Sequence, residues 1–136
     1  MDATVDQPIT VVLVDDSAAY RLGMARAIQR HEELDLIGEF DGGLAGLAAI
    51  EDLDPDVVVL DFRMPDIDGI QVCERVRGLE ERVHTKALLI SADIDEPTRA
   101  LALASGASCV MSKGASRRDI CTAAVSLARA GRLRIH

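Results

Sequence analysis

Aromatic residues are almost absent from this chain of 136 residues: they make up 2% of it, without a single tryptophan, whereas hydrophobic residues make up 49%. A chain of this length can fold as one domain with its own core, so that core must be built from aliphatic side chains. No apolar run approaches the roughly 20 residues of a membrane-spanning helix. The acidic N-terminus lacks the basic and then apolar order of a signal peptide. We therefore expect a cytoplasmic protein that does not associate with a membrane.

Cysteine and histidine patterns that would indicate a zinc site are also missing. The three cysteines, Cys73, Cys109 and Cys121, have no metal-type spacing, and the three histidines are far apart in the sequence. Buried thiols in a reducing compartment account for the cysteines better than a disulfide or a zinc ion does. Surface positions are expected for the histidines.

Positive charge is scarce. Fifteen lysines and arginines stand against twenty-three acidic residues, which gives a formal net charge of −8. Nonspecific binding to nucleic acid requires a basic face, so this balance argues against direct nucleic-acid binding by the chain. A basic C-terminal portion is interpreted as a solvated helix face or a dimer surface rather than a DNA contact. Its residues are Arg117, Arg118, Arg129, Arg132 and Arg134.

Apolar strand-like runs alternate with amphipathic helical segments. Strands are predicted at 9–14, 34–40, 56–61, 86–91 and 109–111, with helices between them and a last helix at 116–130 that Gly131 ends. Five strands alternating with five helices imply a parallel sheet covered on both faces. The doubly wound, flavodoxin-like (βα)5 arrangement with strand order 2-1-3-4-5 is the natural solution. On the first predicted helix, 18–30, Leu22, Ala25 and Ile28 fall on one face, and Ser17 can cap that helix.

The domain organisation follows from this pattern. Residues 9–130 are expected to form one domain, because no linker, repeat or low-complexity segment interrupts them. Residues 1–8 are expected to be a flexible N-terminus. Residues 131–136 are expected to be a C-terminal tail or the start of a linker.

Polar residues stand where four of the predicted strands end. Asp15 and Asp16 follow the first strand, Asp61 ends the third, Ser91 ends the fourth and Lys113 follows the fifth. Because the carboxyl ends of parallel strands meet at one edge of the sheet, we expect these side chains to lie close together. Asp61 directly follows four apolar residues, and a charge beside a dry core costs several kcal/mol unless it is paired. A functional role for Asp61 is therefore expected.

The chemistry of this set is coherent. Three clustered carboxylates repel one another unless a cation lies between them, and aspartate oxygens with several waters suit Mg²⁺. A carboxylate beside the ion can attack a phosphorus atom and become an acyl phosphate. A lysine ammonium and a hydroxyl donor can offset the negative charge of the transferred group. Asp61, which has no polar neighbour on its strand, is the candidate nucleophile.

Four motifs in order carry a resemblance to a known family. They are VDD at 14–16, LDFRMPDIDG at 60–69, SA at 91–92 and SKG at 112–114. With these motifs the chain resembles the receiver domain of two-component response regulators over residues 9–130. The separations of Ser91 and Lys113 from Asp61 are also those of typical receivers.

The resemblance implies a role for each acidic residue. Asp61 would accept a phosphoryl group from the phosphohistidine of a sensor histidine kinase. Asp16 and Asp61 would bind Mg²⁺ directly, Asp15 would act mainly through water, and the carbonyl of Arg63 would complete the metal site. The domain would act as a signalling switch rather than as an enzyme.

Two further residues have roles by the same resemblance, and two positions depart from the family pattern. Ser91 would swing to hold a phosphoryl oxygen, and Lys113 would pair with the phosphoryl group. Gly114 follows the lysine where many receivers have a cis-proline, and Val110 stands where a switch tyrosine or phenylalanine often lies. The hydroxyl half of the usual switch is thus present, and the aromatic half is missing.

The stretches DFRMP at 61–65 and YRLG at 20–23 resemble receivers attached to a LuxR/NarL-type helix-turn-helix domain. That DNA-binding domain would need on the order of 60 more residues after the last helix. The resemblance therefore implies an output in transcription through a domain that this chain does not contain; a receiver that stands alone is the alternative. We also expect phosphorylation to strengthen a homodimer through the last helices or adjacent strand faces.

Two other functions remain open on the residues alone. A Mg²⁺-dependent phosphohydrolase also forms an aspartyl phosphate, but such enzymes generally have a second aspartate two residues after the nucleophile, where this chain has Arg63. Steady turnover of a phosphate ester would favour that function. A phosphorylation-independent interaction module on the same fold is the third possibility, which failure to bind Mg²⁺ would favour.

Two acidic or glycine-rich stretches near these motifs have simpler interpretations. The segment DGGLAG at 41–46 lacks the full G-x-G-x-x-G pattern and follows the second strand rather than the first, so it is interpreted as a flexible turn rather than a phosphate-binding loop. Asp66 and Asp68 are interpreted as loop and helix-start residues rather than metal ligands.

Overall fold

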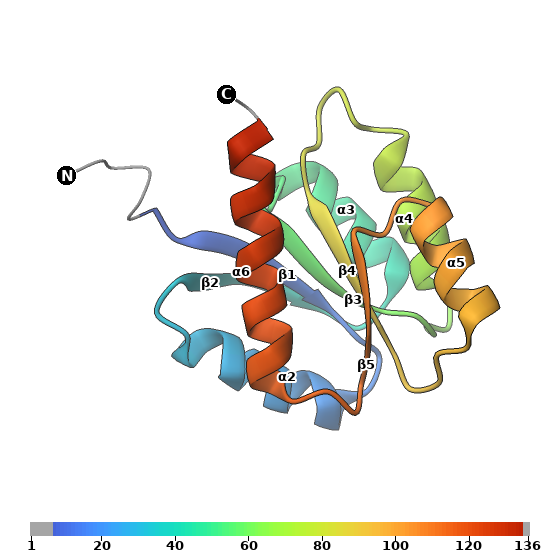
Figure 1. Ribbon diagram of the computed structural model, residues 1–136, viewed down its shortest axis with the longest axis horizontal. Helices are drawn as coiled ribbons and strands as arrows, with labels where there is room; N and C mark the ends of the chain where they lie inside the picture. The colour runs from blue at the N-terminus through green and yellow to red at the C-terminus, as the bar shows by residue number, and fades with distance from the viewer. Residues whose placement is uncertain (1–6, 135–136) are drawn as a thin grey trace.

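The computed structural model describes residues 7–134 as five strands alternating with five helices (Figure 1). All strand pairs are parallel, and the sheet order is β2-β1-β3-β4-β5, so the predicted flavodoxin-like doubly wound fold is confirmed. The elements are β1 (Ile9–Val14), α2 (Ala18–Arg30), β2 (Leu34–Phe40), α3 (Gly43–Leu53), β3 (Val57–Asp61), α4 (Gly69–Arg77), β4 (Lys86–Ser91), α5 (Glu96–Ala104), β5 (Cys109–Ser112) and α6 (Arg117–Arg134).

Some expectations fall on residues that the structure does not describe. The predicted flexible N-terminus, residues 1–8, lies outside the described residues except for its last two, and so do the last two residues of the predicted tail. His136 and the side chain of Arg134 are therefore not placed. Across residues 7–134, no helix has the length and apolar character needed to span a membrane.

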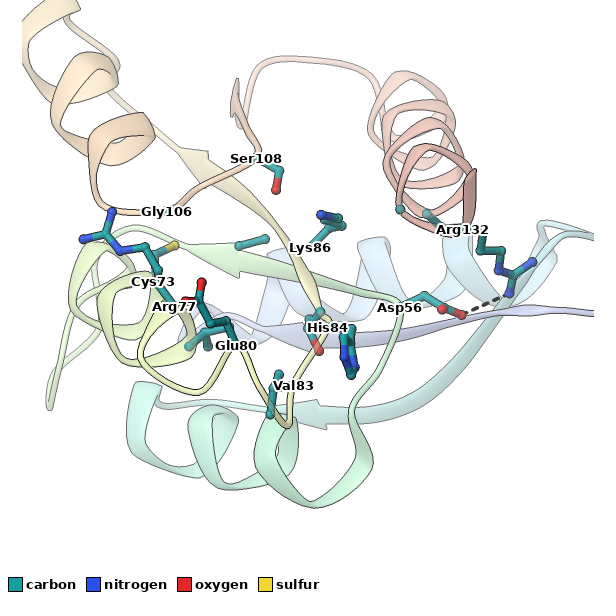
Figure 2. A pocket seen from close by; sticks show the side chains of 15 residues that line it. Asp56, Cys73, Arg77, Glu80, Val83, His84, Lys86, Gly106, Ser108 and Arg132 are labelled. Carbon is teal, nitrogen blue, oxygen red and sulfur yellow. Dashed lines mark hydrogen bonds and ion pairs between the residues drawn. The ribbon is translucent and has the colours of Figure 1, made fainter. Parts of the chain in front are cut away.

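The amino ends of the strands form one edge of the sheet, and charged residues pair with each other there. Asp56 lies just before β3, and its Oδ2 accepts a hydrogen bond from Thr10 N at 2.9 Å. The same oxygen accepts a hydrogen bond from Arg132 Nη2 at 3.2 Å (Figure 2). The same arginine donates to the carbonyl of Pro8 at 3.1 Å. A cavity of about 380 Å³ lies beside this pair, between the ends of α4, β4 and α6. This edge is thus tied together by long-range polar contacts.

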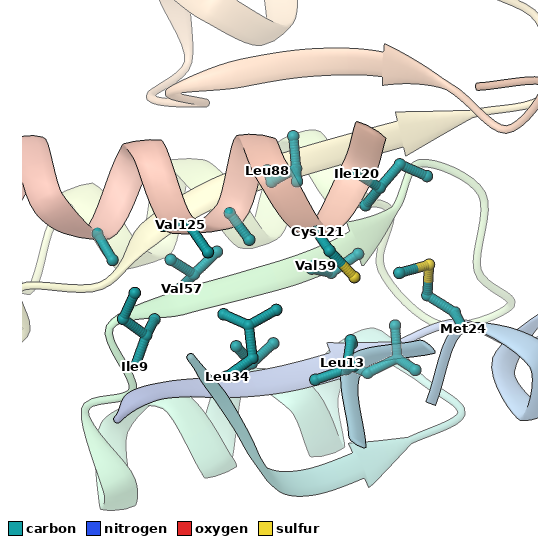
Figure 3. Close-up of a cluster of buried hydrophobic side chains, with 14 of the residues drawn as sticks. Ile9, Leu13, Met24, Leu34, Val57, Val59, Leu88, Ile120, Cys121 and Val125 are labelled. Atoms are coloured by element: carbon teal, nitrogen blue, oxygen red, sulfur yellow. The ribbon is translucent and has the colours of Figure 1, made fainter. Parts of the chain in front are cut away.

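The core is divided by the sheet into two aliphatic layers, as strand alternation requires. On one face, side chains of β1, β3 and β4 such as Leu13 and Val59 pack against α2 and α6 (Figure 3). On the other face, alternate residues of the same strands, such as Val58 and Leu60, pack against α3, α4 and α5. The predicted aliphatic core is confirmed, and Cys73 and Cys121 are buried in it as free thiols, whereas Cys109 is a free thiol that is only partly buried.

Helix starts follow the capping residues in the sequence. Ser17 Oγ accepts a hydrogen bond from Tyr20 N at the start of α2, as predicted. Asp68 begins α4 with a reciprocal pair of bonds to Gln71. Asp95 Oδ1 accepts a hydrogen bond from Thr98 N at the start of α5. Because the helices follow the strands, all three caps lie near the edge formed by the carboxyl ends of the strands.

Two details of the predicted helices are wrong. Gly131 does not end the last helix, which continues to Arg134. The bonds from Arg132 to Asp56 and to the carbonyl of Pro8 hold the turn that contains this glycine against the sheet, so tertiary contacts outweigh the low helix propensity of glycine. Leu22 is 55% exposed rather than inward, and Met24 is buried beside Ala25 in its place.

Candidate functional site

Asp61 is the last residue of β3 and lies at the carboxyl edge of the sheet. It pairs in register with Ile90 of β4, and the next residue, Phe62, donates its N–H to the Ile90 carbonyl at 2.9 Å. The chain then turns back, because Gly69 N donates to Phe62 O at 2.7 Å. A Cβ on Gly69 would lie 2.6 Å from the Asp61 carbonyl, so glycine is needed for this close approach. The result is a buried carboxylate, 5% exposed, at a fixed strand end.

Asp15 follows β1 at the same edge, and its side chain is fully buried. Its N–H donates to the Phe40 carbonyl at 3.0 Å, which holds it beside β2. Asp15 Oδ1 accepts from Ser17 N at 2.8 Å. Asp15 Oδ2 lies 2.9 Å from Lys113 Nζ, and among the described residues this ion pair is its one recorded contact. A buried acceptor with spare capacity is the kind of atom that a cation or its bound water can satisfy.

Lys113 follows β5 and joins the two buried aspartates. Its N–H donates to the Ser91 carbonyl at 2.9 Å, which places the side chain at the carboxyl edge. Its Nζ lies 2.9 Å from Asp15 Oδ2 and 3.4 Å from Asp61 Oδ2. Burial acts to lower the pKa of Lys113, but its bonds to the Asp15 and Asp61 carboxylates raise the pKa above its ordinary value. The lysine is therefore held as a charged ammonium.

Asp16 completes an acidic cluster with the two buried aspartates. Carboxylate oxygens of Asp15, Asp16 and Asp61 lie within 4.8 Å of one another, although Asp16 is exposed. Burial, and after it the charge of Asp15, raise the pKa of Asp61 from 3.8 to about 6, against the opposing effect of Lys113. Three carboxylates thus lie together, and Lys113 pairs with two of them, Asp15 and Asp61. A donor set made only of oxygen atoms, with an excess of negative charge, fits a hard divalent cation such as Mg²⁺.

The remaining predicted site residues lie at or near this edge. Ser91 ends β4 and is buried, and its Oγ donates to the Asp93 carbonyl at 2.9 Å. Arg63 lies on the loop between β3 and α4 with its side chain exposed. Val110 is buried in β5, and the peptide bonds of the described residues, including that of Gly114, are trans. Metal binding by Arg63 and phosphoryl contact by Ser91 remain predictions.

Tyr20 is a site residue that was not predicted as one and belongs to the YRLG stretch at 20–23. Its ring lies under Lys113, with Nζ 4.5 Å from the ring centroid, a geometry in which a cation and an aromatic ring attract each other. Its hydroxyl is buried with no hydrogen-bond partner among the described residues. Burial raises the pKa of Tyr20, and Lys113 opposes that rise. The available signal was that this single tyrosine lies in the first turn of the helix that follows Asp15 and Asp16.

The glycine-rich segment and its neighbours also have clear positions. Only Asp41 and Gly42 of the segment lie in a turn; residues 43–46 begin α3, so the interpretation of the whole segment as a flexible turn is wrong. The Gly43 and Leu44 amides bond to Asp66, which lies on the β3–α4 loop. Asp68 is the N-cap of α4. The interpretation of Asp66 as a loop residue and Asp68 as a helix-start residue is thus confirmed. The amides at the start of α3 bind the Asp66 carboxylate.

The C-terminal arginines are partly used inside the fold. Arg132 pairs with Asp56, and Arg129 pairs with Glu33 across α6 and the turn before β2. The guanidinium of Arg117 lies against Gly23 of α2. Several of these positive charges therefore stabilise the position of α6 on the sheet.

Comparisons with known proteins agree with this arrangement. A family model described as "Response regulator receiver domain" matches residues 11–125. The probable transcriptional regulatory protein NarL of Mycobacterium tuberculosis is 39% identical over 124 residues, which are 90% of this chain and 56% of that protein. The nitrate/nitrite response regulator protein NarL of Escherichia coli is 28% identical over 114 residues, which are 84% of this chain and 52% of that protein.

A solved structure gives the same result. The receiver domain of a NarL response regulator from Mycobacterium tuberculosis has a TM-score of 0.87 and 36% identity, covering 90% of this chain and 98% of that chain. The chain spans about half the length of the curated NarL proteins. The strand order, the acidic carboxyl edge with its lysine, and these matches show that the chain belongs to the response regulator receiver domain family, with relatives of the NarL type.

Proposed function

We propose that Asp61 accepts a phosphoryl group from the phosphohistidine of a sensor histidine kinase in a Mg²⁺-dependent reaction. The observation that carries this proposal is the position of the Asp61 carboxylate, at a fixed strand end, 3.4 Å from an ammonium and clustered with two further carboxylates. One Asp61 oxygen attacks the phosphorus atom, and the phosphorus–nitrogen bond breaks. The histidine nitrogen leaves with the electron pair of that bond and takes up a proton from solvent.

The residues around Asp61 fit this transfer. The Lys113 ammonium, already beside Asp61 Oδ2, offsets negative charge on the phosphoryl oxygens as they approach. Ser91 Oγ, which now donates to the Asp93 carbonyl, would exchange that bond for one to a phosphoryl oxygen. Asp16 and Asp61 would bind Mg²⁺ directly in this proposal, and Asp15 would act through water.

The metal ion would supply positive charge between the carboxylates and the phosphoryl oxygens. The carbonyl of Arg63, on the loop after β3, is proposed as a further ligand. In our proposal the domain is a switch and not an enzyme with an external substrate. The reason is the exposed Arg63 side chain, which stands where a phosphohydrolase would need an acid–base aspartate.

The output that this receiver controls is proposed from the name and length of a relative. The mycobacterial relative is named a transcriptional regulatory protein and is nearly twice as long as the aligned part. We infer that this receiver controls transcription in the cytoplasm through a helix-turn-helix domain outside this chain, with no DNA contact of its own. Movement of Ser91 would transmit the signal without an aromatic partner, since Val110 occupies that position.

Phosphorylation is further proposed to strengthen a homodimer through the last helices or adjacent strand faces. Sedimentation velocity with and without a phosphate mimic tests this proposal. We expect a larger sedimentation coefficient with the mimic. Equal sedimentation coefficients with and without the mimic, at protein concentrations well above those used for phosphorylation, would contradict dimerisation.

The phosphoacceptor is tested by intact mass after incubation with acetyl phosphate and Mg²⁺. We expect one phosphoryl adduct on the unsubstituted chain and none on Asp61→Asn. Asp56→Asn is the matched control, because it removes a carboxylate at the opposite edge of the same sheet, and it should be phosphorylated like the unsubstituted chain. An adduct that persists on Asp61→Asn would show that another residue is the acceptor.

A further inference from the structure

The loop between β3 and α4, residues 62–68, is hydrogen-bonded to the rest of the fold in its middle as well as at its ends. Its first residue, Phe62, bonds to Ile90 O and accepts from Gly69 N, so the two ends of the loop are tied together. Its middle is tied to a different part of the chain, the start of α3, through Asp66. The loop also carries Arg63, whose carbonyl is proposed above as a metal ligand.

Asp66 acts as the missing cap of α3. Its Oδ1 accepts from Gly43 N at 2.9 Å and from Ile67 N at 2.8 Å, and its Oδ2 accepts from Leu44 N at 2.9 Å. Gly42, the residue at the N-cap position, has no side chain that could make these bonds. A carboxylate is favourable at this place because the first amides of a helix lack partners inside the helix and carry partial positive charge. These bonds lower the pKa of Asp66, the bond from Leu44 N most.

The packing between the loop and the helix is close, and at Gly43 it requires glycine. A Cβ on Gly43 would lie 2.5 Å from the Ile67 carbonyl, and a Cβ on Gly42 would lie 3.1 Å from Asp66 Oδ2. The two glycines of the DGG turn therefore allow the loop to lie against the start of α3. Their role is to receive Asp66 and Ile67, which explains a motif that the proposed phosphoryl chemistry does not use.

We propose that Asp66 is a positioning residue for the Mg²⁺ site: by tying the β3–α4 loop to α3, it holds the backbone after Asp61 in place before the ion binds. This role rests on the proposed function. A loop fixed only at its ends would have to become ordered when its backbone binds an ion, and that loss of conformational entropy weakens binding. Groups that hold ligands in place without touching the metal commonly change metal affinity.

Three variants separate this role from simple stabilisation of α3. Asp66→Ala removes all three bonds. Adding Gly42→Asp to it supplies a carboxylate at the N-cap position itself, where the backbone is extended and accepts any residue, and so restores the helix cap without the link to the loop. Asp95→Ala is the matched control, because Asp95 also caps a helix at this edge of the sheet but bonds only to Thr98 in its own segment.

The main measurement is a Mg²⁺ titration followed by tyrosine fluorescence. Tyr20 is the only tyrosine of a chain without tryptophan, and its ring lies beside Lys113 in the site. We expect Asp66→Ala, with or without Gly42→Asp, to weaken Mg²⁺ binding by about tenfold, the lower end of the range for residues that support metal ligands. Asp95→Ala should leave the dissociation constant unchanged. Amide hydrogen exchange without Mg²⁺ should become faster in residues 62–68 of both Asp66 variants.

The outcomes distinguish the role of Asp66 from the proposed function. Recovery of full Mg²⁺ affinity in Asp66→Ala with Gly42→Asp would show that Asp66 only stabilises α3, and would overturn the proposal. Unchanged affinity in Asp66→Ala would overturn it as well. A chain without substitutions that neither binds Mg²⁺ nor accepts phosphate would overturn the proposed function, and the role of Asp66 with it.

Discussion

The two edges of the parallel sheet both carry buried or partly buried aspartates, but only one edge leaves them short of positive charge. At the amino edge, Asp56 Oδ2 accepts from Thr10 N and Oγ1 and from Arg132. At the carboxyl edge, the carboxylates of Asp15, Asp16 and Asp61 cluster together, and Lys113 pairs with Asp15 and Asp61. The same residue type is therefore structural at one edge and chemically available at the other.

A second aspartate at the amino edge, Asp54, also has partners for its carboxylate oxygens. Asp54 Oδ1 accepts from His84 N at 2.7 Å and from Thr85 Oγ1 at 3.2 Å, and its Oδ2 lies 3.1 Å from His84 Nδ1. Its left-handed backbone, φ 42°, ends α3 and turns the chain toward β3. The comparison teaches that an aspartate at a strand end indicates function only where its neighbours do not satisfy it.

The largest expected effect that would sharpen this comparison comes from replacing one lysine by methionine at each edge. Lys113→Met removes the ammonium that faces Asp61, so we expect the rate of phosphorylation by acetyl phosphate to fall about 100-fold, as when one preorganised stabilising group is removed from an active site. Lys86→Met removes a lysine from the amino edge, beside the cavity of Figure 2, and should leave the rate unchanged. Intact mass against time measures both rates.

A similar fall in both variants would mean that loss of charge anywhere on the domain slows the reaction. That result would remove the distinction between the two edges. A Lys113→Met rate within a factor of about two of the unsubstituted chain would exclude this lysine from the stabilisation of the transferred group.

The next effect is on stability, and its sign should differ between the edges. Folding raises the pKa of Asp61 from 3.8 to about 6, so the folded state loses stability as the pH rises through that interval and does not regain it above pH 6. Without Mg²⁺ at pH 7, Asp61→Asn should therefore raise the free energy of unfolding by about 1–3 kcal/mol. Asp56→Asn should lower it by about 1–2 kcal/mol, because it weakens satisfied hydrogen bonds.

Urea unfolding followed by circular dichroism, in the presence of a chelator, measures both changes. Mg²⁺ should then stabilise the unsubstituted chain and have little effect on Asp61→Asn. If both substitutions lowered stability, the carboxyl edge would be as well satisfied as the amino edge, and the excess of negative charge at Asp61 would not matter to folding.

Most of the site could be predicted because chain order alone determines it. In a parallel sheet every strand ends at the same edge, so a polar residue at each strand end specifies a cluster without any knowledge of distances. Asp15, Asp16, Asp61 and Lys113 were found in this way, and the structure brings them together. The strand boundaries followed equally well from the apolar runs, because a buried parallel strand is apolar on both faces.

The contacts that could not be predicted join segments that have no periodic relation. The ring of Tyr20 reaches from α2 to Lys113, which follows β5, and Asp66 caps a helix that begins 23 residues before it. No local pattern specifies either pairing, since each depends on how a loop packs against the start of a helix at one edge. Gly131 is the converse case: its local preference was clear, and contacts made by Arg132 with the start of the chain and with Asp56 outweighed it.

The smallest effect follows from that glycine, which lies at the amino edge of the sheet inside α6. Gly131→Ala should raise the free energy of unfolding by about 0.5–1 kcal/mol, because alanine loses less backbone entropy than glycine in a helix. The added methyl would lie 3.1 Å from Lys86 Cε, the end of a flexible side chain that can move. The phosphorylation rate should not change, because the substitution lies at the edge whose charges are already satisfied. A faster or slower reaction in Gly131→Ala would show that the amino edge influences the carboxyl edge, which the separate sets of contacts at the two edges argue against.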